Sequence, residues 1–224
     1  MSGLLVTGTD TGVGKTFVAC ALARALRAGG RRVTVMKPVE TGVANDAPDD
    51  ARRLREAAAD PASLDDICPY RLRAPLAPAV AARLEGVTID LARLEALIRR
   101  RLEDADVLLV EGAGGLLVPI ADSVTWADLA ARLRLPLLVV AANRLGTINH
   151  CALTARVADA MGLRVVGFVL SSPGAVRDHS ADTNAAAVTR LTGLPCLGEL
   201  PHLDDPAHAH LDGARFLVAL SKNS

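Results

Sequence analysis

The stretch Gly8-Thr9-Asp10-Thr11-Gly12-Val13-Gly14-Lys15-Thr16 decides the fold of this chain. It lies between an apolar segment at residues 4–7, which we expect to be a strand, and an Ala- and Leu-rich segment at residues 15–28, which we expect to be a helix. A glycine-rich turn at this position points backbone N–H groups at one spot, and the helix N-terminus adds positive potential there. Lys15 supplies a cation that can reach the β and γ phosphates of a nucleotide, and Thr16 supplies a hydroxyl for Mg²⁺. The stretch therefore predicts a phosphate-binding loop, one residue longer than the usual pattern.

The rest of the chain alternates short apolar runs with longer Ala-, Leu- and Arg-rich segments. The runs are continuously apolar, as a parallel sheet covered on both faces requires, and the short connections favour an open α/β sheet with helices on both faces. We therefore expect one α/β domain of the P-loop NTPase type over residues 1–224, with an irregular part at residues 60–88. Further strands are expected at residues 32–36, 107–110, 137–142, 165–170 and 196–200, and further helices at residues 49–59, 91–102, 152–161 and 182–191.

The location of a ligand site follows from this topology, because ligands bind open α/β sheets at the carboxyl ends of the strands. Functional side chains are therefore expected directly after the six strands. Arg99-Arg100-Arg101, at the end of an expected helix, is interpreted as a solvated helix end.

Composition excludes several classes of protein. Half of the 224 residues are apolar, which excludes a disordered chain, and 25 basic residues balance 25 acidic ones, which leaves no net field to attract nucleic acid or an anionic membrane. No apolar run is long enough to span a bilayer, and the first residues do not resemble a signal peptide. The four cysteines form no Cys-x-x-Cys pair, so neither a zinc site nor a disulfide framework is expected, and the chain is predicted to be cytoplasmic.

Three further segments follow expected strands and carry glycines or charged residues. They are Lys37-Pro38-Val39-Glu40-Thr41-Gly42, Glu111-Gly112-Ala113-Gly114-Gly115 and Leu145-Gly146-Thr147-Ile148-Asn149-His150. Together with the phosphate loop, this set resembles the dethiobiotin synthetase family of biotin biosynthesis, and the resemblance extends from residue 3 to about residue 203. The longer phosphate loop is itself a feature of that family.

The resemblance implies an ATP-dependent ligase that joins CO₂ to 7,8-diaminononanoate (7,8-diaminopelargonate). One amine of the substrate is carbamylated by CO₂, the carbamate oxygen attacks the γ-phosphate, and the second amine attacks the mixed carbamic–phosphoric anhydride. The ureido ring of dethiobiotin closes with release of ADP and phosphate. The protein mainly positions the reactants and neutralises their charge.

The resemblance also assigns residues to roles. Thr11, Lys15 and Lys37 are the implied catalytic residues, because a carbamate anion must approach an anionic phosphate. Two unit charges about 4 Å apart repel by about 4 kcal/mol at an effective dielectric constant of about 20, so a second cation is physically reasonable. The implied nucleotide-binding residues are Gly12, Val13, Gly14, Lys15, Thr16, Phe17, Asp50, Glu111, Gly112, Ala113, Gly114, Ser171, Ser172, Pro201, His202 and Leu203.

Hard oxygen ligands suit Mg²⁺, and the resemblance implies Thr16, Glu111 and one aspartate as its ligands. Asp50 fits the aspartate position best, with its neighbour Asp49 left open, and one of the two is also expected to serve as the N-cap and first-turn acid of the helix there. The implied substrate-binding residues are Thr41, Gly146, Thr147, Ile148 and Asn149. In this family the helix that opens at Gly146 reaches substrate in the neighbouring subunit, so the resemblance implies a homodimer.

The segment Ser171-Ser172-Pro173 departs from the family, which often carries Asn-Asp here to read adenine. One hydroxyl cannot reproduce the two-point contact of an amide, so we hypothesise that nucleobase selectivity is weak.

Two alternatives share a similar ATP-binding fold. A dimeric ATPase switch of the septum-positioning or chromosome-partition type would usually carry an extra lysine early in the loop, where this chain has Thr9, Asp10 and Thr11. It would also often end in a basic amphipathic helix, whereas residues 211–224 hold only Arg215 and Lys222 as basic residues. A corrinoid amidase-type synthetase would need a glutamine amidotransferase domain, for which the chain is too short.

Overall fold

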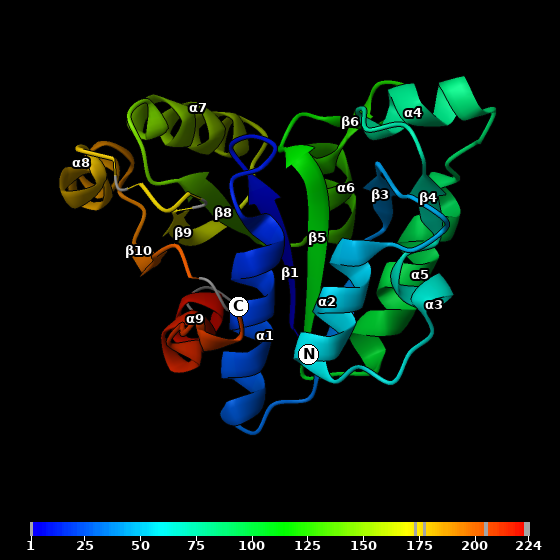
Figure 1. Ribbon diagram of the computed structural model, residues 1–224, viewed down its shortest axis with the longest axis horizontal. Helices are drawn as coiled ribbons and strands as arrows, with labels where there is room; N and C mark the ends of the chain where they lie inside the picture. Colours follow the sequence, from blue (N-terminus) through cyan, green and yellow to red (C-terminus); the bar gives the residue numbers. More distant parts are fainter. Residues whose placement is uncertain (1, 173, 177, 204–205, 222–224) are drawn as a thin grey trace.

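A six-stranded sheet forms the centre of the protein (Figure 1). The computed structural model describes residues 2–172, 174–176, 178–203 and 206–221. The strand order is β10-β9-β8-β1-β5-β2, and every neighbouring pair is parallel. The strands are β1 (Ser2–Gly8), β2 (Val33–Met36), β5 (Val107–Gly115), β8 (Leu137–Ala142), β9 (Val165–Ser171) and β10 (Cys196–Leu200). The predicted parallel α/β sheet is therefore confirmed.

Helices cover both faces of this sheet, because its central strands are apolar on both sides. Every residue of β8 is buried, for example. The helices are α1 (Lys15–Ala28), α2 (Asp49–Ala58), α5 (Leu91–Glu103), α6 (Trp126–Leu133), α7 (Thr147–Ala160), α8 (Ala181–Thr192) and α9 (Gly213–Ser221). One face packs against α1, α2 and α9, and the other packs against α5, α6, α7 and α8. In Figure 1 the first group lies in front of the sheet.

The carboxyl ends of the parallel strands meet at one edge of the sheet, at the top of Figure 1. Two strands are longer than the sequence predicts. β5 continues to Gly115 and β9 to Ser171, so Glu111 lies inside a strand rather than after it. The helix expected from residue 152 also begins earlier, at Thr147. β5 continues past an irregularity in its pairing with β1, where Val6 faces Glu111 and Gly8 faces Gly115, and β9 ends on a serine. Apolar periodicity alone does not reveal either continuation.

The segment expected to be irregular contains short elements. These are α3 (Leu64–Ile67), β4 (Tyr70–Leu72) and α4 (Pro78–Glu85), and β4 pairs in parallel with β3 (Val39–Thr41). A second small pair is antiparallel, between β6 (Pro119–Ala121) and β7 (Val124–Thr125), and a 3₁₀ turn lies at η1 (Pro206–His208). The elements of three or four residues are too short for a hydrophobic period to identify them. α4 has eight residues and begins at Pro78, and a helix tolerates proline at its first position although prolines made the segment look irregular.

The end of α5 corrects the expectation of a solvated arginine run. Arg101 is only 5% exposed and forms an ion pair with Asp60, which is itself buried. β2 is the edge strand of the sheet, and the pair fills that edge, because Asp60 accepts a hydrogen bond from Val35 N at 2.9 Å and Arg101 donates to Val35 O. A charged sequence run does not show which of its members faces a strand edge.

Two expectations about the chain as a whole concern cysteines and membranes. All four cysteines are free, and Cys20, Cys68 and Cys151 are buried. Within the described part of the chain, no helix combines the length and the apolar character needed to cross a bilayer.

Candidate active site

The loop between β1 and α1 adopts the geometry expected of a phosphate-binding turn. Gly12 and Gly14 have φ values of 73° and 89°, in the left-handed region that glycine adopts without strain. Gly14 precedes the first residue of α1 and leaves its first N–H groups without a side-chain cap within the described residues. The ammonium of Lys15 folds back over the loop and donates to Asp10 O at 3.0 Å. The loop thus presents backbone N–H groups and a buried cation at one place.

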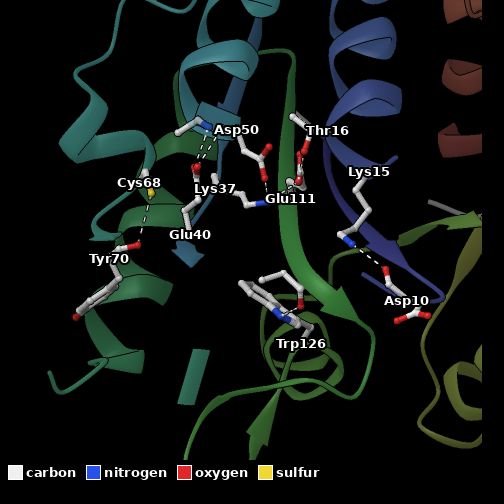
Figure 2. A network of polar contacts seen from close by, with 12 residues as sticks. Asp10, Lys15, Thr16, Lys37, Glu40, Asp50, Cys68, Tyr70, Glu111 and Trp126 are labelled. Atoms are coloured by element: carbon white, nitrogen blue, oxygen red, sulfur yellow. Dashed lines mark hydrogen bonds and ion pairs between the residues drawn. The ribbon is translucent and has the colours of Figure 1, made fainter. Parts of the chain in front are cut away.

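A second lysine lies next to this loop, between two carboxylates (Figure 2). Lys37 follows β2 directly, and its Nζ donates to Asp50 Oδ2 at 2.7 Å and to Glu111 Oε1 at 2.5 Å. Thr16 Oγ1 donates to the same Glu111 oxygen at 2.8 Å. Lys37 and Glu111 are 4% and 1% exposed. Four side chains, from α1, the residue after β2, α2 and β5, therefore meet at the carboxyl ends of the strands.

Burial and charge shift the pKa values of these groups in different directions. Burial and the Lys37 ammonium lower the pKa of Lys15 to about 8, although Glu111 opposes the shift. Burial would also lower the pKa of Lys37, but the Glu111 and Asp50 carboxylates outweigh it and raise that pKa above its ordinary value. Burial raises the pKa of Glu111, whereas Lys37 and Thr16 hold the pKa of Asp50 below its usual range despite burial. The site therefore holds one firmly protonated lysine and one that can titrate.

The geometry distinguishes the two candidate aspartates. Asp50 points at Lys37, while Asp49 forms an exposed pair with Arg52 at 2.8 Å. Both aspartates lie in the first turn of α2, as expected of a first-turn acid, but neither is the N-cap, because the residue before the helix is Pro48, without a side-chain cap. Glu40 takes that role from β3, where it accepts hydrogen bonds from the first turn of α2. Glu40 was not predicted to be functional, and its only signal in the sequence is its place three residues after Lys37.

The glycine-rich end of β5 packs against Trp126, which was not predicted to be functional either. Trp126 is fully buried at the start of α6, and its Nε1 donates to Ala113 O at 2.9 Å. A Cβ on Gly112 would lie 3.2 Å from the indole ring, so the ring and the strand are in close contact. Gly114 lies close to the phosphate loop, because its Cβ would lie 3.5 Å from Thr11 Oγ1. The only tryptophan of the chain thus supports the segment that faces Thr11.

The expected nucleobase-binding residues lie at the ends of β9 and β10. Ser171 is 1% exposed, and a Cβ on Gly14 would lie 2.5 Å from its Oγ, so this side chain packs against the phosphate loop. Ser172 N donates to Leu200 O at 2.9 Å, which places Ser172 beside the segment Pro201-His202-Leu203. Pro201 and His202 are exposed. Pro173 lies outside the described residues.

The expected substrate-binding residues lie on two elements. Thr41 ends β3, and Gly146, with φ 95°, precedes α7. Thr147 is buried, Ile148 is half-buried and Asn149 is exposed. A groove of about 440 Å³ lies between the phosphate loop, the β5–β6 connection and α7; its lining is Thr9, Asp10, Thr11, Gly115, Leu116, Leu117, Val118, Pro119, Leu153, Thr154 and Val157. The expected catalytic residue Thr11 therefore faces an open, largely apolar groove.

The donor set fits a hard divalent cation shared with a nucleotide. Asp50, Glu111 and Thr16 offer carboxylate and hydroxyl oxygens, the donors that Mg²⁺ prefers. Glu111 Oε2 is buried without a hydrogen-bond partner among the described residues, which leaves it available to a ligand. Within the same residues no group of three or more His, Cys, Asp or Glu side chains could hold a metal alone. Mg²⁺ bound here would therefore take its other ligands from water and phosphates.

A parallel sheet with such a loop ahead of its first helix defines a P-loop nucleotide-binding protein. A family model described as an AAA domain matches residues 2–209, and the chain belongs to this family. A ParA family ATPase from Chlorobium tepidum TLS has a TM-score of 0.57 at 14% identity over 98% of this chain and 90% of that one. Signal recognition particle 54 kDa protein from Aeropyrum pernix K1 has the same score at 16% identity, over 97% of this chain and 45% of that one. At such identities the likeness concerns the fold alone.

Curated relatives identify the family within this class. The ATP-dependent dethiobiotin synthetase BioD of Anaeromyxobacter dehalogenans (strain 2CP-1 / ATCC BAA-258) is 52% identical over 92% of this chain and 93% of its own length. The protein of the same name from Bacillus subtilis (strain 168) is 39% identical over 91% of this chain and 88% of its own length. The chain belongs to the family of ATP-dependent dethiobiotin synthetases. The predicted family is thereby confirmed, and the synthetase is favoured over the ATPase switch.

Proposed function

We propose that this protein joins CO₂ to 7,8-diaminononanoate at the expense of ATP and closes the ureido ring of dethiobiotin. The observation that carries the proposal is the convergence of Lys15 and Lys37 with Thr16, Asp50 and Glu111 at the carboxyl ends of three neighbouring strands. A switch ATPase usually carries its extra lysine early in the phosphate loop, whereas the second lysine here is Lys37, buried after β2, and it suits a reaction in which two anions must meet.

The proposed sequence begins when CO₂ adds to one amine of the substrate, which loses a proton and becomes a carbamate. A carbamate oxygen then attacks the γ-phosphorus, the bond to the β-phosphate oxygen breaks, and ADP leaves. The second amine attacks the carbamoyl carbon of the mixed anhydride, phosphate leaves, and the ring closes with loss of that amine's proton. Lys37, with its raised pKa, stays positive throughout and offsets the charge of carbamate and phosphate.

The other expected residues fit this scheme as binding groups. The N–H groups of Gly12, Val13 and Gly14, with those of Thr16 and Phe17, hold the phosphates, and Gly112, Ala113 and Gly114 let the γ-phosphate approach the backbone. Mg²⁺, held by Thr16, Asp50 and Glu111 when bound, neutralises phosphate charge. Thr11 and Thr41 contact the diamine, and the exposed groove beside Thr11 supports a place for its aliphatic chain.

We further propose a cytoplasmic homodimer in which Gly146, Thr147, Ile148 and Asn149 bind the carboxylate of substrate held by the neighbouring subunit. The exposed leucines around this surface support a subunit contact, since Leu117, Leu145 and Leu153 are 53%, 82% and 55% exposed. Sedimentation at micromolar concentration tests the dimer, and a monomer that retains full activity contradicts it.

Nucleobase recognition is proposed to be weak. The buried Ser171 hydroxyl packs against Gly14, which leaves Ser172, Pro201, His202 and Leu203 to contact the base. Turnover with ATP, CTP and GTP tests this point. Similar kcat/KM values for the three support it, and a strict preference for ATP contradicts it.

The decisive experiment measures phosphate release with ATP, Mg²⁺ and bicarbonate, with and without 7,8-diaminononanoate. A synthetase releases phosphate only with the diamine and forms dethiobiotin in equal amount, which mass spectrometry detects. Phosphate release that does not depend on the diamine would favour the ATPase switch.

A further inference from the structure

Glu40 is a buried carboxylate that none of the proposed chemical steps uses. It lies in β3, three residues after Lys37, and is 7% exposed. Its two oxygens accept hydrogen bonds from Asp50 N and Ala51 N, each at 3.0 Å (Figure 2). Both donors belong to the first turn of α2, whose N–H groups have no partner inside the helix. Glu40 is therefore a long-range cap that joins the strand after Lys37 to the helix that carries Asp50.

An ordinary cap would achieve helix stability at lower cost. A Ser, Thr or Asp in place of Pro48 could cap α2 from the adjacent position, close to solvent. Glu40 is instead buried, and burial together with the Asp50 carboxylate raises its pKa, against the two backbone hydrogen bonds that lower it. Burial of the Glu40 carboxylate costs free energy that a solvent-exposed cap would not cost, so we expect Glu40 to do more than stabilise the helix.

The chain around Glu40 shows what that purpose is. The connection from β3 to α2 is irregular, with φ values of 75° at Gly42, 51° at Asn45 and 55° at Asp46. Ala51, in the first turn, and Leu54 are fully buried and hold α2 against the core by apolar contact. Apolar contact is not directional, so it does not by itself orient Asp50 toward Lys37 and Thr16. The two hydrogen bonds of Glu40 do so, because one of them holds the backbone of Asp50 itself.

We infer that Glu40 is a positioning residue that holds Asp50 where it can bind the metal–nucleotide complex and Lys37. This inference rests on the proposed function for the identity of the reaction, but the geometry it describes concerns metal and nucleotide alone. Residues that orient a metal ligand typically contribute a factor of about 10 to 100 in metal affinity or activity. Loss of the Glu40 carboxylate is therefore expected to weaken metal binding about tenfold.

The test compares Glu40→Ala and the isosteric Glu40→Gln with a matched control, Asp90→Ala. Asp90 also caps a helix, since its Oδ1 accepts from Arg93 N at 3.0 Å at the start of α5, outside the site. Mn²⁺ binding is titrated by electron paramagnetic resonance with a non-hydrolysable ATP analogue present. Affinity for the analogue without metal, kcat, KM and Tm are measured on the same samples.

The expected result separates positioning from stability. Glu40→Ala lowers Mn²⁺ affinity and kcat about tenfold and changes metal-free analogue affinity less than twofold. Glu40→Gln keeps one acceptor oxygen and falls between this variant and the wild type. Asp90→Ala lowers Tm and leaves Mn²⁺ affinity and kcat unchanged.

Wild-type Mn²⁺ affinity in the Glu40 variants, at a temperature where they are folded, would overturn the inference whatever their Tm. If Glu40→Ala fails to fold, the Glu40→Gln measurements decide. If the wild-type protein makes no dethiobiotin, the proposed function fails, while the Mn²⁺ titration still decides the role of Glu40.

Discussion

Two buried ion pairs lie beside β2, and they differ in how completely they are bonded. Along the outer edge of the strand, Asp60 receives Arg101 together with Val35 N and Ala62 N, so that both carboxylate oxygens are used. After its end, Glu111 receives Lys37 and Thr16 on a single oxygen, and its other oxygen is buried without a partner among the described residues. The first pair satisfies the backbone groups of an edge strand, whereas the second leaves one carboxylate oxygen free to bind a ligand.

This difference gives a physical criterion for function. A buried charge whose bonding is complete contributes to the fold, and removal of one partner is costly because it leaves the other uncompensated. A buried carboxylate with one unbonded oxygen is desolvated without full compensation, and a bound cation can supply what is missing. Glu111 is such a group, and the partly exposed Asp50 lies beside it. Arg101 Nε also has no hydrogen-bond partner in the part of the chain that the structure describes, so incomplete bonding of the acid, and not of the base, is the feature that separates the two pairs.

The largest expected effect is that of Lys37→Met. Removal of a cation about 4 Å from two approaching anions forfeits about 4 kcal/mol at an effective dielectric constant of about 20, or about a thousandfold in kcat. Glu111, whose pKa burial already raises, can take up a proton, so we expect the variant to remain folded. Single-turnover dethiobiotin formation and far-ultraviolet circular dichroism measure the two effects. Full-rate ring closure in this variant would remove the basis of the proposed mechanism.

Asp60→Ala reverses that pattern. It leaves Arg101 buried and two backbone N–H groups without their acceptor, and breaking a buried pair in this way costs about 3–5 kcal/mol. We expect the free energy of unfolding to fall by this amount in a urea titration, while kcat per folded molecule stays within twofold. A loss of kcat with unchanged stability would contradict the assignment of the Asp60–Arg101 pair to the fold and of the Lys37–Glu111 pair to the reaction.

Lys15 differs from Lys37 in that its ammonium bonds to a backbone carbonyl rather than to a carboxylate. Burial lowers the pKa of Lys15 to about 8, so the empty protein loses this positive charge as the pH rises through 8. Phosphates bind the ammonium form, and ATP affinity should therefore fall about tenfold per pH unit above pH 8. Lys37, with its raised pKa, does not titrate in this range.

Calorimetry with a non-hydrolysable ATP analogue at pH 7, 8 and 9 measures this dependence, and buffers of different ionisation enthalpy report the proton taken up on binding. Lys15→Arg serves as the control, because a guanidinium stays charged throughout and removes the inflection. Affinity that stays constant to pH 9 would show that the Lys15 charge does not titrate in the free protein.

The features that depend only on the order of residues along the chain could be predicted from the sequence. The six parallel strands, the loop before α1 and the placement of Lys37 at a strand end all follow from apolar runs and their junctions. Glu40, Asp60 and Arg101 could not be predicted, because their partners lie on other elements and only the packed chain brings them together. Trp126 was missed for the same reason, since nothing near it in sequence points to the backbone of Ala113.

The smallest expected effect is that of Trp126→Phe, which tests whether the Lys37–Glu111 pair also depends on the indole that packs against the end of β5. Trp126→Phe keeps an aromatic ring against Gly112 but removes the donor to Ala113 O, which is worth about 1 kcal/mol. Because Ala113 is only partly buried, water can replace the lost donor, so KM for ATP should rise about fivefold at most and kcat should hardly change. In the wild type the sole tryptophan should change its fluorescence when nucleotide binds. No change in either measurement would show that the end of β5 keeps its position without the indole, and would confine the functional region to the lysines and carboxylates.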